Sequence, residues 1–286
     1  MSEINKVPFS QKIAFGFGML ANQMFPAVIS IFIVVLVQRL GFPGWMWGFV
    51  MIFPRLFDAI TDPIMGFISD NTKSKWGRRR QYVLLGSIIM GFSFIVMWQL
   101  HRESSIDYNF IYFLSWSLLF YVGLTIFSVP YVAMGYEMSD DFHERTNIMA
   151  IAQFIGQWAW VIAPWFWVIM DDQNFFESSE VAVRELAIWV GLVCMTFAMI
   201  PALCIKSKSS LNQDYDSITF KNIINSLYTI FIINFGEAFK IKAFRRLCIA
   251  TFLIFNSFNT VAAFTYFIIV FFLFNGVTGP DGAWWW

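Results

Sequence analysis

Three ionisable residues stand inside an apolar stretch of the sequence: Arg55, Asp58 and Asp62. Their spacing of three and then four residues places them on one face of a helix. The surrounding segment, residues 45–69, is long and apolar enough to cross a bilayer. Charged groups in lipid are costly, and by default they mark a path for an ion or a polar solute. The spacing therefore predicts a polar site within a transmembrane helix.

The formal charges on this face indicate what the site would bind. Arg55 can pair with one aspartate, which leaves the other carboxylate uncompensated. A monovalent cation would complete the balance, either sodium held by carboxylate and hydroxyl oxygens or a proton on one carboxyl group. Thr61 adds a hydroxyl group between the two aspartates. The alternative is that the three charges only pair with one another or with a neighbouring helix.

A basic loop, NTKSKWGRRR, follows this apolar segment directly. Acidic residues follow the fourth apolar segment and are expected on the same side of the membrane, where they could pair with the arginines and hold that end closed. The simpler alternative is that the basic residues set only the topology and the acidic loop is solvated. The residues expected in this gate are Gly66, Asp70, Gly77, Arg78, Arg79, Arg80, Glu137 and Arg145.

Composition excludes an ordinary soluble domain. Of the 286 residues, 58% are hydrophobic, 20% are aromatic and 13% are charged, whereas about a quarter of the residues of soluble domains are charged. The three cysteines lack metal-ligand spacing, and no phosphate-binding loop or nucleophile with a base stands out. We therefore expect an all-α polytopic membrane protein that is not an enzyme, with no cofactor, no metal other than sodium and no nucleic-acid partner.

Apolar segments of about 20 residues predict seven membrane spans. Three of the 19 Lys and Arg residues, Arg39, Arg102 and Arg184, fall in predicted external segments, and Arg55 lies within a span. The rest are cytoplasmic if the N-terminus is inside, as the positive-inside rule requires. We expect a multi-pass protein of the cell membrane, or of the inner membrane in a bacterium. The predicted spans are 13–38, 45–69, 81–100, 109–136, 146–170, 182–205 and 243–275.

The spans divide into three parts. Residues 1–205 are expected to form a six-helix bundle, and residues 206–241 a cytoplasmic linker that contains an interfacial amphipathic helix. Residues 242–286 would then be the first helix of an incomplete second bundle, with three terminal tryptophans at the membrane interface. Six spans followed by a seventh of the same polarity predict a two-repeat transporter cut short. A complementary C-terminal half is therefore an expected partner.

Two long motifs carry a specific resemblance. The run RLFDAITDPIMGFISDNTKSKWGRRR, residues 55–80, and the run IFSVPYVAMGYEMSDDFHERTN, residues 126–147, stand in order, and AFRRL at 243–247 opens the seventh span. Together they resemble the glycoside-pentoside-hexuronide:cation symporters, the melibiose permease group of the major facilitator superfamily. The resemblance covers essentially the whole chain, as the N-terminal half of such a transporter plus helix VII.

The resemblance implies roles for individual positions. Asp58 and Asp62 would be cation ligands, with Thr61 and Thr125 beside them. The sequence departs from the melibiose permease pattern on the sugar side. Ser128 replaces an aspartate, Val132 replaces a stacking tryptophan, Gln153 replaces an arginine, and Asn22 is the polar residue nearest to a missing helix I aspartate.

The predicted function is cation-coupled symport of a sugar or glycoside by alternating access. Candidate substrate contacts are Asn22, Ser128, Gln153 and Gln157, of which the two glutamines share a helix face. Buried amides that only join helices are the simpler interpretation. Two other functions stay open, a lipid or lysolipid transporter of the same superfamily and a non-transporting seven-helix fragment or receptor-like protein.

Overall fold

The computed structural model describes residues 6–38, 40–171, 176, 178–205, 218–229, 234–273 and 275, and every regular element among them is helical. The chain separates into two compact units, Met1–Ile223 and Ile224–Trp286. The boundary between them falls inside the segment expected to be a linker, residues 206–241.

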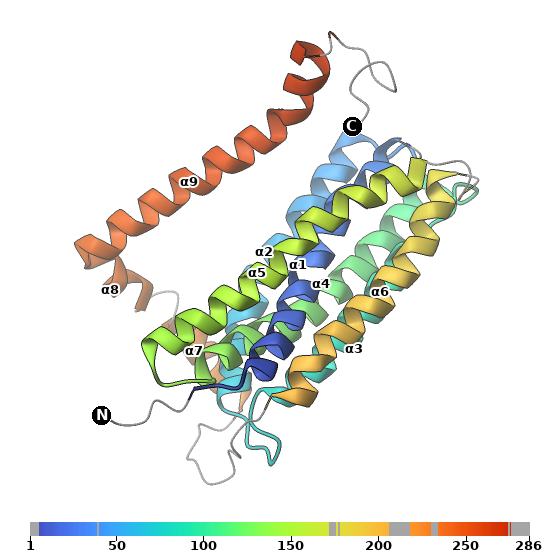
Figure 1. Ribbon diagram of the computed structural model, residues 1–286. Helices are drawn as coiled ribbons and strands as arrows, with labels where there is room; N and C mark the ends of the chain where they lie inside the picture. Colours follow the sequence, from blue (N-terminus) through green and yellow to red (C-terminus); the bar gives the residue numbers. More distant parts are fainter. Residues whose placement is uncertain are drawn as a thin grey trace. The chain divides into compact units, whose positions relative to one another are not determined.

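The first unit contains six long helices that lie alongside one another (Figure 1). α3 packs against both α4 and α6, α1 packs against α5 and α6, and α2 packs against α4. The packing order is therefore α2, α4, α3, α6, α1, α5, with α2 and α5 as the two outermost members. The helices are α1 (Phe9–Gln38), α2 (Gly44–Asp70), α3 (Arg80–Met97), α4 (Ile106–Glu137), α5 (Phe142–Asp171) and α6 (Ser179–Cys204).

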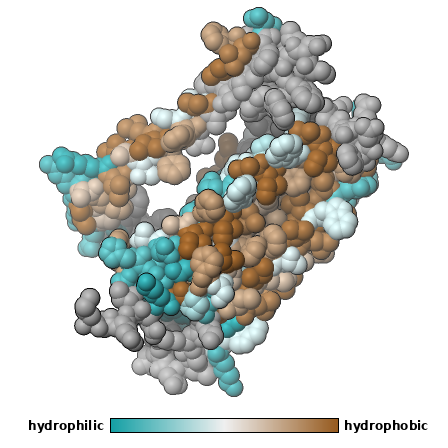
Figure 2. All heavy atoms as spheres, in the orientation of Figure 1, coloured by the Kyte–Doolittle hydropathy of each residue, from teal (hydrophilic) through white to brown (hydrophobic). Residues whose placement is uncertain are grey.

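Five of these helices, α1, α3, α4, α5 and α6, are long and apolar enough to cross a membrane. α2 has 27 residues, about 40 Å of helix, but it carries the three charges of the predicted polar face. Apolar side chains cover much of the visible bundle surface, and hydrophilic side chains gather toward one end (Figure 2). The first unit is thus a multi-pass membrane bundle in which α2 contributes a charged stripe.

Most helices start a few residues before the predicted spans because their first residues are polar. α4 begins at Ile106, where the Ser105 hydroxyl accepts a hydrogen bond from the Tyr108 amide. Ser178 caps α6 in the same way. Hydropathy locates the lipid-crossing part of a helix, whereas the caps that begin it lie outside that part.

Close helix contacts hold the bundle together. Gly86 of α3 lies against the backbone of α4 at Phe127, and Gly123 of α4 lies against the backbone of α3 at Met90. A Cβ atom at either glycine would overlap the facing backbone, so both residues must stay small. Small residues that let backbones approach closely are the usual basis of helix packing in membranes, where the hydrophobic effect between helices is weak.

The described residues that follow α6 form further helices. α7 spans Phe220–Tyr228 and α8 spans Phe235–Lys240. Both helices lie within the segment that was expected to contain an interfacial amphipathic helix, and the position of such a helix at the membrane surface stays a prediction. α9 spans Lys242–Phe267 and continues as a π-helix, Ile268–Leu273, so a helix covers most of the predicted seventh span. Among the described helices, α9 is not one of the five that are long and apolar enough to cross a membrane, and its crossing stays a prediction. The expected membrane-interface tryptophans, 284–286, lie outside the described residues.

Candidate functional site

α2 and α4 run side by side in the same direction, so residues at matching depths face each other. The rings of Phe49 and Phe110 lie 6.1 Å apart near the start of both helices. Further along, Asp58 meets Thr125. The order of these contacts is the same along both helices, and the aspartates of α2 lie against Thr125 of α4.

The Thr125 hydroxyl is the centre of the candidate site. Its Oγ1 atom lies 3.1 Å from Asp58 Oδ1, 3.0 Å from Asp62 Oδ1 and 3.2 Å from Thr61 Oγ1. Thr125 is 2% exposed, so water reaches its side chain poorly. The structure thus brings together all four residues that were expected to bind a cation. We call this group the α2–α4 oxygen cluster.

The oxygen cluster contains more acceptors than hydrogens. Thr125 has a single hydroxyl hydrogen, yet two carboxylate oxygens lie within hydrogen-bond distance of it. The Thr61 hydroxyl lies near the backbone carbonyls of Phe57 and Asp58, at 3.2 and 3.4 Å, and can donate to only one acceptor. A group of oxygens with too few hydrogens suits a hard cation or an added proton.

The donor atoms of the oxygen cluster indicate the kind of ion that it suits. The residues that the structure describes contain no group of three or more His, Cys, Asp or Glu side chains that could hold a metal ion. The oxygen cluster combines two carboxylates with hydroxyl groups, a donor set typical of sites for hard ions rather than for zinc or copper.

Arg55 does not pair with the aspartates, contrary to the sequence-based expectation. Among the described residues it makes no ion pair with Asp58 or Asp62, and its guanidinium carbon lies 5.8 Å from the centre of the Tyr121 ring. The aromatic face attracts the cation electrostatically. Once Asp58 is known to meet Thr125, the spacing accounts for this contact, because Tyr121 precedes Thr125 by four residues and Arg55 precedes Asp58 by three.

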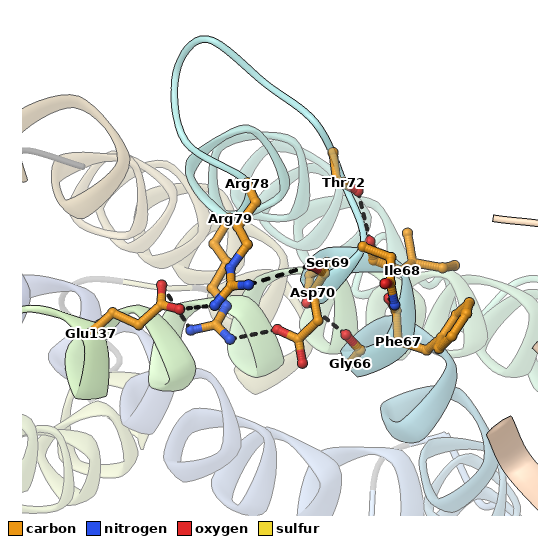
Figure 3. Close-up of polar contacts among 10 residues, drawn as sticks. Gly66, Phe67, Ile68, Ser69, Asp70, Thr72, Arg78, Arg79 and Glu137 are labelled. Carbon is orange, nitrogen blue, oxygen red and sulfur yellow. Dashed lines mark hydrogen bonds and ion pairs between the residues drawn. The ribbon is translucent and has the colours of Figure 1, made fainter. Parts of the chain in front are cut away.

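A second charged group, the arginine cluster, joins the ends of α2 and α4 (Figure 3). Arg79 donates to Asp70 at 2.5 Å and to Glu137 at 3.0 Å. Arg78 also pairs with Glu137 and donates to the Asp70 carbonyl at 3.4 Å. Arg79 is buried, while Asp70 and Glu137 are exposed. The expected pairing of this loop with acidic residues is thus present for these four residues, which define the arginine cluster.

Two other arginines of the expected gate lie elsewhere. Arg80 donates through Nε to the Ala202 carbonyl at 2.6 Å and through a terminal nitrogen to the Leu203 carbonyl at 3.2 Å. It therefore caps the last turn of α6, where cations are favoured. Arg145 donates to the nearby Asp140 carbonyl at 3.1 Å. Charge alone could not separate these roles, because all the arginines carry the same group.

The glycines of the expected gate have unequal roles. Gly77 has a φ of +91°, a conformation that favours glycine, and it turns the loop before the arginines. A Cβ atom at Gly66 would meet only Val129, at 3.9 Å. Gly66 therefore does not lie in a close contact between helices in this structure. Its carbonyl accepts a hydrogen bond from Ser69 instead.

An ion pair that the sequence reasoning missed ties the start of α1 to the start of α5. Lys12 Nζ lies 2.9 Å from Glu144 Oε1 and 2.7 Å from the Asn147 side-chain oxygen. Glu144 also accepts a hydrogen bond from the Val7 amide at 2.9 Å. Both charged side chains are buried. No local pattern links residues this far apart in the chain, so only the packing of α1 on α5 identifies the pair.

The expected substrate residues lie on three helices. Gln153 and Gln157 are exposed on α5, while Asn22 on α1 and Ser128 on α4 are half-buried. Trp160 follows the glutamines at seven and three residues, so it shares their face of α5. Its indole N–H donates to the Gln23 side chain of α1 at 3.2 Å. The α5 face therefore presents two amides and one oriented indole ring.

Residues 14–285 match the family described as MFS/sugar transport protein. The uncharacterized symporter sll1374 of Synechocystis is 30% identical over 149 residues, covering 50% of this chain and 27% of that protein. The lactose permease of Leuconostoc lactis is 25% identical over 261 residues, covering 82% of this chain and 40% of that protein. The sodium-dependent lysophosphatidylcholine symporter 1 of Xenopus tropicalis is 26% identical over 145 residues, covering 50% of this chain and 27% of that protein.

The similarity covers different shares of this chain and of its relatives. The chain spans about a quarter to two fifths of the length of these three relatives. The match to the family, by contrast, covers nearly all of this chain.

Proposed function

Because the chain belongs to the MFS/sugar transport protein family, we propose that it takes part in cation-coupled symport of a sugar or glycoside across the membrane. The observation that carries this proposal is the position of the Thr125 hydroxyl between two carboxylates. The coupling ion would bind there, and the solute would bind nearer the α5 face. The relatives are named as permeases and symporters, in agreement with the expectation that the chain is not an enzyme.

The oxygen cluster explains why a cation would be required. With both aspartates ionised, one carboxylate oxygen receives the Thr125 hydrogen and the other faces the lone pairs of the same hydroxyl oxygen. Two like charges held this close repel each other. A sodium ion or a proton would relieve the repulsion and supply the missing positive charge. Both ions fit this argument, so both belong in the experiment.

The proposed substrate contacts come from the α5 face. Gln153 and Gln157 can donate to and accept from hydroxyl groups, and a ring held by a hydrogen bond, as in Trp160, can lie against the apolar face of a sugar. No aspartate or arginine remains at the positions that differ from melibiose permease, Ser128 and Gln153. These neutral groups suit an uncharged sugar or glycoside.

A lysolipid is the second candidate substrate. One relative is named a sodium-dependent lysophosphatidylcholine symporter. Large aromatic side chains are also exposed on α5, including Phe154, Trp158 and Trp165, and they could contact an acyl chain. The same cation site would serve either substrate, so the two candidates differ only in the solute.

Alternating access requires a second bundle that rocks against this one around a central site. We propose that the complementary half covers α2 and α5, the outermost helices of the packing order. The arginine cluster would hold the cytoplasmic end of α2 against α4, with the N-terminus on the cytoplasmic side. Labelling of an N-terminal tag from outside intact cells would contradict this orientation and would revive the receptor-like alternative.

Thermal unfolding of the purified chain in detergent tests the proposal. We expect sodium, or a lower pH, to raise the melting temperature, and we expect sugars or lysolipids to raise it further only when the cation is present. Asp58→Asn and Asp62→Asn should abolish the cation response while the chain stays folded. If both variants respond to sodium and to pH as the unmodified chain does, the cation site lies elsewhere and the proposal fails.

A further inference from the structure

We propose that Tyr121 is a positioning residue that holds Arg55 away from the carboxylates and so keeps the cation site available. This inference rests on the proposed function, because it gives Arg55 the role of an internal competitor for the coupling ion. The observation behind it is the position of the Arg55 guanidinium carbon over the Tyr121 ring, 5.8 Å from the ring centre, together with the absence of an ion pair between Arg55 and either aspartate in the described helices.

The spacing along α2 favours a different partner for Arg55. Asp58 lies three residues further on, a distance at which opposite charges on a helix attract each other. In a low-dielectric setting this attraction would be stronger than in water. An arginine that nevertheless lies over an aromatic ring is held there by a competing contact. A guanidinium group is well suited to that contact because it is planar and weakly hydrated.

The parallel register of α2 and α4 makes this contact part of the site. Arg55 and Tyr121 form the layer one helical turn before the layer of Asp58 and Thr125. Tyr121 is half-buried on α4, and its ring packs edge-on against Phe120, which is fully buried. The ring is thus fixed on one helix, while the long arginine side chain on the other helix can move between two partners.

Two positions of Arg55 follow from this arrangement. Over Tyr121, the guanidinium leaves both carboxylates for a sodium ion or a proton. Turned toward Asp58, it would neutralise that carboxylate and exclude the ion. Cation binding and the contact of Arg55 with Tyr121 therefore favour each other, because a ligand that binds one of two states shifts the population toward that state. Loss of the aromatic ring would shift Arg55 toward Asp58 and weaken cation binding.

Carbodiimide labelling of Asp58 tests this inference in the absence of any added cation. The reagent modifies protonated carboxyl groups, and a paired arginine keeps the carboxylate ionised. In the purified full chain in choline buffer, followed by peptide mass spectrometry, Tyr121→Leu should slow the modification of Asp58. The expected decrease is about two- to thirtyfold, the range that corresponds to the loss of one cation–π contact.

Matched variants separate positioning from a structural effect. Tyr121→Phe keeps the ring and should label as fast as the unmodified chain. The double variant Tyr121→Leu with Arg55→Gln lacks the competitor and should label at least as fast as the unmodified chain. A general disturbance of α4 would not be rescued by removing Arg55. Unchanged labelling in Tyr121→Leu, or a double variant as slow as the single one, would overturn the inference.

The same labelling assay keeps this inference distinct from the proposed function. Protection of Asp58 in the unmodified chain by sodium chloride, compared with choline chloride, reports on sodium binding. The comparison among the Tyr121 and Arg55 variants uses no sodium at all. Absence of sodium protection would thus count against sodium as the coupling ion, while the variant comparison would still decide the role of Tyr121.

Discussion

Asp58→Asn should stabilise the cation-free protein, although it removes a charged group from a polar site. Asp58 Oδ1 and Asp62 Oδ1 lie 3.1 and 3.0 Å from the same hydroxyl oxygen, so they are at most about 6 Å apart. At an effective dielectric constant of about 20, two unit charges at that distance repel by about 3 kcal/mol. Asp62 is exposed, which weakens the repulsion. We therefore expect Asp58→Asn to raise the free energy of unfolding by about 1 to 3 kcal/mol.

The asparagine should also satisfy the oxygen cluster without an ion. Its amide group can donate a hydrogen bond to Asp62 while its oxygen accepts one from Thr125, so no acceptor is left without a hydrogen. The stabilisation of Asp58→Asn should therefore appear in choline buffer near neutral pH. It should disappear when sodium is added, or the pH is lowered, because the unmodified protein then gains its missing positive charge.

Thermal unfolding in detergent, followed by intrinsic tryptophan fluorescence, measures this difference. Glu103→Gln is a suitable control, since Glu103 is an exposed carboxylate in the loop before α4. That variant should match the unmodified protein in both buffers. Two results together would contradict a repulsion between the carboxylates: Asp58→Asn melts at a lower temperature than the unmodified protein in choline, and sodium or acid raises its melting temperature by as much as that of the unmodified protein.

Two further predictions concern single contacts. Thr125→Val keeps the shape of the side chain but removes the hydroxyl at the centre of the oxygen cluster. The apparent affinity for the cation should therefore fall at least tenfold, which corresponds to about 1.4 kcal/mol, while Thr125→Ser should keep most of the affinity. A sodium and pH titration of the melting temperature checks this, and equal affinity in the valine variant would contradict it. Arg80→Leu leaves the Ala202 carbonyl without its donor and should cost about 1.5 to 3 kcal/mol of stability in either buffer. Chemical unfolding without added cation measures that loss, and a cost that depends on sodium would show that Arg80 belongs to the cation site.

Periodicity within one helix was sufficient to predict three of the four residues of the oxygen cluster. Asp58, Asp62 and Thr61 fall close together on α2 because helical geometry repeats every 3.6 residues, whatever surrounds the helix. Thr125 entered only through the family resemblance. Its contact with both aspartates depends on the parallel register of α2 and α4, and a single sequence does not contain that distance.

The arginines show where charge patterns stop being informative. The run Arg78, Arg79 and Arg80 reads as one basic patch, and its neighbours in space decide what each residue does. Arg78 and Arg79 meet the acids at the ends of α2 and α4, whereas Arg80 points to the carbonyls that end α6. Adjacent residues at a helix start project in different directions, so their roles diverge.

The sequence by itself determined that this is an all-α membrane protein with a charged stripe on one helix, because hydropathy and helical period are local properties. The tertiary structure decided which partners the charges have. It placed Thr125 between two carboxylates and turned Arg55 from its neighbour Asp58 to the ring of Tyr121. Such choices between competing partners depend on distances between helices of a few ångströms, and those distances are set by the packing of the whole bundle.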